Sequence, residues 1–107
     1  MKKTIPLRDI TLFILMAVLV LLFWRNNLLA TVFLSFEFLI SAIIFYNKKE
    51  KLFFILTGVF GVILETLGGL VGIWTYASPN FITVPVWIFF CWGFTFMFLR
   101  SIVDLRR

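Results

Sequence analysis

Four long apolar runs, separated by short polar connections, constrain this chain more than any other feature. A helix that crosses the hydrocarbon core of a bilayer needs about 20 mainly apolar residues, within a range of about 17–25. The runs cover residues 7–24, 28–46, 52–74 and 85–103. With 63% hydrophobic and 14% charged residues, the chain has too few polar residues to cover a soluble core. The sequence therefore predicts an all-α integral membrane protein, in which residues 1–107 form a single four-helix transmembrane domain.

The basic residues predict how the four segments are oriented. Nine of the ten Lys and Arg residues lie at the two chain ends or between the second and third segments, and Arg25 is the exception. By the positive-inside rule, this distribution predicts an antiparallel bundle in the cytoplasmic (inner) membrane, with both termini cytoplasmic. Arg8 with Asp9, and Arg100 with Asp104, are predicted to be surface ion pairs at that end. Short basic caps of this kind favour contact with membrane lipid over nucleic acid.

Glu65 lies on a stripe of small residues in the third apolar segment. The stripe has a member every three or four residues, and its other members are Gly58, Gly61, Gly68 and Gly72. This spacing places all five residues on one helix face. Such a face lets a second helix approach closely, so the four glycines are predicted to be helix-packing positions. An acid inside a membrane is costly and indicates a functional site. The partner helix belongs either to the same chain or to another copy, so a homo-oligomer or a larger membrane complex remains open.

A second acid, Glu37, lies within the second segment. It follows Leu28 by nine residues, and Glu65 precedes Trp74 by nine residues. Because the two segments are expected to run antiparallel, both acids are predicted to lie at matching depth, about 13 Å below the outer helix ends. Such a pair could share one proton or hold a cation, which makes Glu37 and Glu65 the candidate catalytic residues. The alternative is that each acid bonds a neighbouring hydroxyl, such as that of Ser41, and holds helices together.

The connection before the fourth segment is uncharged and is flanked by aromatic residues. The candidate ligand-binding residues around it are Trp74, Tyr76, Asn80, Trp87 and Trp92. Aromatic residues at this depth either form the belt that is typical of a membrane interface or wall a pocket above the two acids. The chain contains no His, which excludes imidazole metal sites and Ser-His catalysis. No metal and no cofactor are predicted, and the single Cys91 cannot form an intrachain disulfide.

One stretch of the chain carries a resemblance to a known group of proteins. Residues 65–88 read ETLGGLVGIWTYASPNFITVPVWI, that is, an acid, glycines, Gly-x-Trp-x-Tyr, a loop and a proline at the next segment. This order is similar to small membrane domains of carotenoid biosynthesis, the lycopene cyclase domain and the bacterioruberin-type carotenoid hydratase. It rests on Glu65, Gly72, Trp74, Tyr76 and Pro85. The cyclase domain carries an acidic pair directly after the matching proline, where this chain has Val86 and Trp87. The resemblance therefore implies an isoprenoid ligand, with Glu65 and Glu37 left to supply a proton.

Three functions are compatible with these features. The first is binding or modification of a hydrophobic, isoprenoid- or carotenoid-like lipid at an outer-half intramembrane carboxylate. In that case an acid with a raised pKa would protonate a polyene, and aromatic side chains would stabilise the carbocation. The second is a proton- or cation-coupled small transporter that acts as an oligomer. The third is an accessory or assembly subunit of a membrane complex, packed through its glycine face. The sequence leaves open whether the protein is an enzyme.

Overall fold

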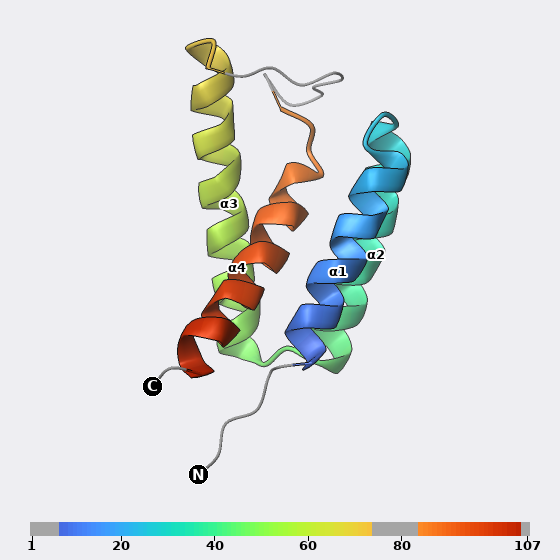
Figure 1. Cartoon of the computed structure of the whole chain (residues 1–107), viewed down its shortest axis with the longest axis vertical. Coiled ribbons are helices and arrows are strands. Elements are labelled where there is room, and N and C mark those ends of the chain that lie inside the picture. The colour runs from blue at the N-terminus through green and yellow to red at the C-terminus, as the bar shows by residue number, and fades with distance from the viewer. Residues whose placement is uncertain (1–6, 74–83, 106–107) are drawn as a thin grey trace.

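Four helices make up the computed structural model, which describes residues 7–73 and 84–105. The helices are α1 (Leu7–Phe23), α2 (Asn27–Ile44), α3 (Lys48–Leu70) and α4 (Ile88–Leu105). Helix α1 begins and α4 ends at the same end of the molecule as the α2–α3 connection (Figure 1). The predicted all-helical fold with four helices is confirmed. The start of α1 and the end of α4 lie at one end of the molecule, as an antiparallel arrangement of four helices requires.

Asparagines set where α2 and α3 begin. The Leu29 N–H donates to Asn26 Oδ1 at 3.1 Å, so Asn26 caps the start of α2. At α3, the Glu50 N–H donates to Asn47 Oδ1 at 2.8 Å, and the Asn47 N–H donates to Glu50 Oε1 at 3.0 Å. This reciprocal capping box satisfies two backbone donors that the helix leaves unpaired. Helix α3 therefore begins four residues before the predicted apolar segment 52–74.

Glycine ends α3 before its predicted boundary. Gly72 has a φ of +83°, in the left-handed region that favours glycine. The Gly72 N–H donates to Gly69 O at 3.2 Å, and the Ile73 N–H donates to Gly68 O at 2.9 Å. These two bonds form a Schellman motif, which stops the helix at Leu70. A Cβ at Gly72 would meet nothing within 4 Å, so this glycine ends the helix and makes no packing contact in the part that the structure describes.

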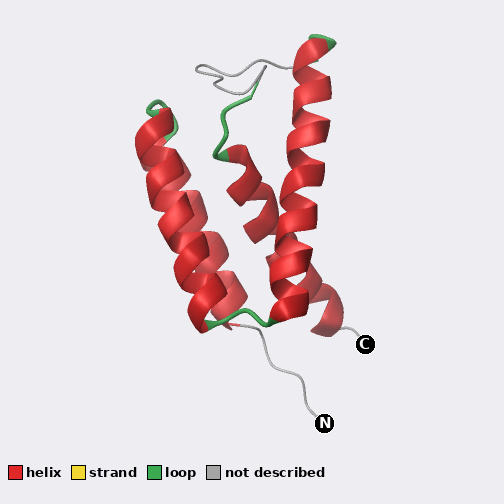
Figure 2. Cartoon of the chain, turned by 180° about the vertical axis from the view of Figure 1, so that it is seen from behind, coloured by secondary structure: helices red, strands yellow, loops and turns green. Residues whose placement is uncertain are grey.

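Helix α4 lies between the α1–α2 hairpin and α3 (Figures 1 and 2). It packs along α3 and α1 and touches α2 over a shorter stretch. The core where these elements meet is aromatic: the Phe54 ring contacts the Phe38 and Phe94 rings at centroid distances of 4.5 and 4.9 Å. Leu34 and Met97 are also fully buried. Helices α2 and α3 therefore meet through the Phe38 and Phe54 rings, but α3 packs mainly against α4 despite the short α2–α3 connection.

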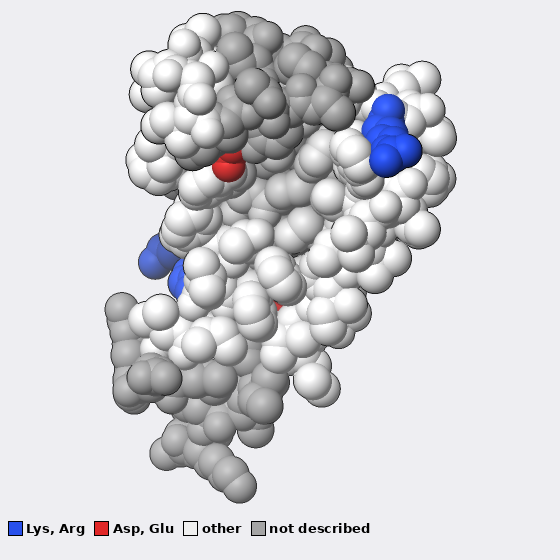
Figure 3. Space-filling view, turned by 45° about the horizontal axis from the view of Figure 1, so that its top comes forward, with Lys and Arg blue, Asp and Glu red and all other residues white. Residues whose placement is uncertain are grey.

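The outer surface of the bundle is apolar on every helix. Ile14, Ile43, Phe60 and Val103, one from each helix, are all more than half exposed. Seen from the end where α3 stops, the described surface carries only isolated charged side chains (Figure 3). Two helices, α2 and α3, are long and apolar enough to cross a membrane. A surface with this much exposed apolar area is stable against lipid or another apolar partner and unfavourable in water.

Candidate functional site

The glycine face of α3 packs against α4 of the same chain. A Cβ built at Gly58 would lie 2.6 Å from the Phe89 ring, and one at Gly61 would lie 2.0 Å from Trp92 Cγ. The contact is reciprocal, because a Cβ at Gly93 on α4 would lie 2.4 Å from the Phe54 ring. Gly68 is also buried. These glycines make room for large aromatic rings, and the described face at Gly58 and Gly61 is therefore already occupied.

Glu65 lies one turn beyond Gly61, where the same packing brings Trp92 to it. The Trp92 indole N–H donates to Glu65 Oε1 at 3.2 Å. The indole is stacked on the Phe96 ring, with centroids 5.5 Å apart. Glu65 itself is half-buried. Gly61 therefore makes room for the ring whose N–H donates to the Glu65 carboxylate.

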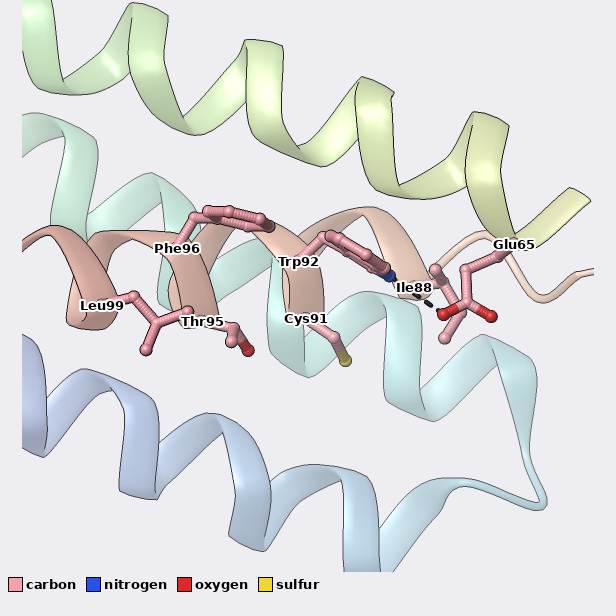
Figure 4. A pocket seen from close by; sticks show the side chains of 7 residues that line it. All are labelled: Glu65, Ile88, Cys91, Trp92, Thr95, Phe96 and Leu99. Atoms are coloured by element: carbon pink, nitrogen blue, oxygen red, sulfur yellow. Dashed lines mark hydrogen bonds between the residues drawn. The ribbon is translucent and has the colours of Figure 1, made fainter.

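A groove of about 420 Å³ begins at this carboxylate and runs along α4. Its lining residues are Glu65, Ile88, Cys91, Trp92, Thr95, Phe96 and Leu99. Figure 4 shows Cys91, Thr95 and Leu99 following one another along the helix, with Glu65 at one end of the set. The volume lies within the range of about 300–1,000 Å³ that is usual for small-molecule pockets. We call this feature the α4 groove. It is an apolar groove with one carboxylate, that of Glu65, at its end.

Glu37 is separated from Glu65. It lies seven residues before the end of α2 at Ile44, whereas Glu65 lies seventeen residues after the start of α3 at Lys48. At 1.5 Å per residue, the two acids lie about 10 Å and about 25 Å from the shared α2–α3 end. The prediction of matching depth is therefore wrong. It assumed that the outer ends of the two helices coincide, whereas the longer α3 extends well past the start of α2.

The Glu37 side chain is buried, with 6% of the residue exposed. Neither of its carboxylate oxygens has a hydrogen-bond partner among the described residues. The Ser41 hydroxyl donates to the backbone carbonyl of Glu37 at 2.8 Å. This hydrogen bond is therefore made to the main chain of α2 and not to the Glu37 carboxyl. The predicted alternative, in which the Ser41 hydroxyl bonds the Glu37 carboxyl, is therefore not what the structure has.

The predicted aromatic residues are divided between core and groove. Trp87 is buried, and its indole N–H donates to Asn27 Oδ1 at 3.1 Å, which ties the start of α4 to the start of α2. Of the two predicted ligand-binding residues that the structure describes, Trp92 lines the α4 groove and Trp87 does not. Trp74, Tyr76 and Asn80 lie outside the residues that the structure describes.

An ionic cluster at the end shared by α1, α3 and α4 is the main feature that the sequence did not predict. Arg8 bonds Asp9 at 3.0 Å and Glu50 at 2.6 Å, and the Ser101 hydroxyl donates to Asp9. Arg100 lies 3.7 Å from Glu50. Asp9 and Glu50 are only 4% and 7% exposed.

The prediction that Arg8 and Asp9 form a surface pair is therefore wrong for Asp9, because helices distant in sequence cover it. Arg100 and Asp104 form a half-exposed pair at 3.8 Å, close to the prediction.

The cluster holds Glu50 in its charged form. Burial raises the pKa of Glu50, but hydrogen bonds from Arg8 and the Asn47 backbone, with the charges of Arg8 and Arg100, outweigh it. The net effect is a pKa below the ordinary value, which favours the carboxylate at neutral pH. Glu50 is thus both the capping residue of α3 and the acceptor of an ion pair from α1. The sequence signal for it was the Asn47–Glu50 spacing of a capping box.

Comparison with known proteins gives no match: no protein-family model, no curated protein and no solved structure matches the chain. Within residues 7–73 and 84–105, no three His, Cys, Asp or Glu side chains are grouped so as to hold a metal ion.

Proposed function

We propose that this protein is a multi-pass protein of the cytoplasmic membrane that binds or modifies a hydrophobic lipid of isoprenoid type. The observation that carries the proposal is the α4 groove, which is long, apolar and ends at the Glu65 carboxyl. An extended hydrocarbon fits such a groove, and a polar or reactive end group of the ligand would meet the single acid. A groove for a compact polar solute would need several polar groups in convergence.

Three observations support the membrane placement. The apolar side chains on the outside of all four helices would be covered by lipid, and α2 and α3 have the length and composition of membrane spans. The basic residues Lys48, Lys49 and Lys51 stand at the end where α1 begins and α4 ends. By the positive-inside rule this end is cytoplasmic, and the α4 groove then opens within the bilayer.

The chemistry available to a bound isoprenoid is proton donation. A carboxylic acid in an apolar groove can protonate a double bond, and the π-faces of Trp92 and Phe96 stabilise a developing carbocation. The hydrogen bond from Trp92 fixes the orientation of Glu65 toward the groove. The resemblance of residues 65–88 to carotenoid-biosynthesis domains supports the same ligand class. Catalysis, as distinct from binding alone, requires that Glu65 deliver its proton.

A groove-blocking variant tests the proposal. Thr95→Trp places a large ring in the α4 groove, whereas Ile43→Trp places the same ring on an 81% exposed position of α2. We expect lipid mass spectrometry of the purified wild-type protein to show an isoprenoid enriched over bulk phospholipid. Thr95→Trp should lower that enrichment by roughly tenfold, the effect of losing about 1.4 kcal/mol of binding. Ile43→Trp should leave it unchanged.

Glu65→Gln separates binding from chemistry. Gln keeps the shape and an acceptor for the Trp92 N–H but has no acidic proton, so the bound isoprenoid should remain while any protonated or hydrated product disappears. Recovery of bulk phospholipid alone from the wild-type protein, with the same profile in all three variants, would rule out the proposal.

A further inference from the structure

The α4 groove is an apolar stretch with charged groups near both of its ends, and this gives it a defined length. Glu65 lies at one end, near Ile88, and Leu99 is the last lining residue at the other end (Figure 4). We infer that the groove is a site for a prenyl chain of about three isoprene units, and that Leu99 sets this length. The inference rests on the proposed function and specifies the size of its ligand.

The length of the groove comes from the helix that lines it. The lining residues of α4 recur with the helical repeat, so they form one face of the helix, from Ile88 to Leu99. These two residues are eleven positions apart, so at 1.5 Å per residue the apolar face is about 16 Å long. In an extended hydrocarbon, carbon–carbon bonds of about 1.5 Å advance the chain by about 5 Å for each four-bond isoprene unit. The face therefore matches about three units in length.

The volume of the groove gives the same size independently. A heavy atom in a packed liquid takes about 30 Å³, the share of one water molecule, so a groove of about 420 Å³ holds about 14 such atoms. A prenyl chain of about three units has about 15 carbon atoms, which agrees with this volume. A carotenoid of about eight units would be about 40 Å long and would leave more than half of its chain outside the groove.

Charged side chains begin directly after Leu99. Arg100, the next residue, lies 3.7 Å from Glu50 and 3.8 Å from Asp104. A hydrocarbon chain that continued past Leu99 would lie against these groups and displace their water, which is unfavourable. Val103, one turn further along α4, is 55% exposed and does not line the groove. Leu99 is therefore the position at which the apolar contacts of a bound chain end.

A series of linear prenols tests the length. Geraniol, farnesol and geranylgeraniol supply two, three and four isoprene units, and the protein is reconstituted in phosphatidylcholine nanodiscs. Retention is measured relative to empty nanodiscs, because prenols also dissolve in the lipid. We expect the affinity to rise roughly tenfold from two units to three, the effect of about 1.4 kcal/mol of added dispersion contacts, and to stay unchanged from three units to four. A further rise at four units, or equal affinity for all three prenols, overturns the inference.

A shortened groove tests the role of Leu99. Leu99→Trp fills the last helical turn of the groove, about 5.4 Å, which is the length of about one isoprene unit. Farnesol should therefore bind roughly tenfold more weakly to this variant, while geraniol keeps its affinity. Val103→Trp is the matched control, because it places the same ring one turn outside the groove and should leave both affinities unchanged. The same length dependence in the two variants would contradict the role of Leu99.

The outcomes for the wild-type protein separate this inference from the proposed function. Retention of prenols with a different dependence on chain length overturns the inference alone, because an isoprenoid is still bound. Retention of none of the three prenols above the level of empty nanodiscs overturns the inference and the proposed function together.

Discussion

At the scale of single residues, two glycines of α3 have different physical roles. Gly61 is required for space, because the Trp92 ring occupies the position where a Cβ would stand. Gly72 is required for conformation, because its φ is +83° and the space around it is open. From the spacing in the sequence, both glycines were predicted to be helix-packing positions on one face of the same helix. Helix periodicity alone does not show where the helix stops, so it could not separate these roles.

Substitution of the two glycines should therefore have different effects. In Gly61→Ala the new Cβ would displace Trp92 from Glu65, and overpacking of this kind costs about 1–3 kcal/mol. Gly72→Asn introduces a residue that tolerates the left-handed region and whose Cβ meets nothing within 4 Å, so we expect a smaller cost than for Gly61→Ala. Thermal unfolding in detergent, followed by circular dichroism, measures both. Equal unfolding temperatures for the two variants would contradict the distinction.

At the scale of elements, the Arg8–Glu50 pair holds α1 against α3. Its members are 42 residues apart, the bond is 2.6 Å, and the Glu50 side chain is nearly buried. In Arg8→Gln, Glu50 and Asp9 lose their closest cation, and a destabilisation of about 1–3 kcal/mol is expected from unpaired buried polar groups. Arg100→Gln is the matched control: its contacts are 3.7 and 3.8 Å and half-exposed, so about 0–1 kcal/mol is expected. Chemical unfolding in micelles compares the two, and a larger loss in Arg100→Gln would contradict this assignment.

The same pair gives the protein a pH dependence. The folded-state pKa of Glu50 lies below its ordinary value of 4.5. The stability that Glu50 contributes is therefore complete above that value and is lost as the pH falls through the lower, folded-state pKa. We expect the difference in unfolding temperature between wild type and Glu50→Gln to be largest at neutral pH and to shrink under acid conditions. A difference that stays constant down to strongly acid pH would show that Glu50 acts only as a helix cap.

The elements show what the sequence can and cannot predict. Apolar runs separated by short polar connections predicted four helices and their order, because the local length of an apolar run decides those features. Contacts between distant segments were not predictable in this way. Trp87 bonds Asn27 across 60 residues, and Trp92 bonds Glu65 across 27. Periodicity identifies an inward face but not the neighbour that covers it, so the packing of α3 mainly against α4 was missed.

At the scale of the whole molecule, charged side chains distinguish the two ends of the bundle. The ionic cluster and the lysines at the start of α3 lie at one end, and Arg25, in the α1–α2 connection, lies at the other. Helix α3, with 23 residues, is about 34 Å long, close to the roughly 30 Å hydrocarbon core of a bilayer. The α4 groove and Glu37 would then both lie within the bilayer, at different depths.

Cysteine labelling tests this orientation, because the chain contains a single cysteine. In a Cys91→Ala background, Arg25→Cys places one thiol at an exposed position in the α1–α2 connection, and Lys49→Cys places one at an exposed position in the first turn of α3. A membrane-impermeant maleimide added to intact cells should label Arg25→Cys, while Lys49→Cys should react only after the membrane is opened. The reason is that nine of ten basic residues favour the Lys49 side as cytoplasmic. Labelling of both variants in intact cells would indicate dual topology, and labelling of Lys49→Cys alone would invert the bundle. Dual topology would place the α4 groove in both leaflets, and inversion would move it to the opposite leaflet.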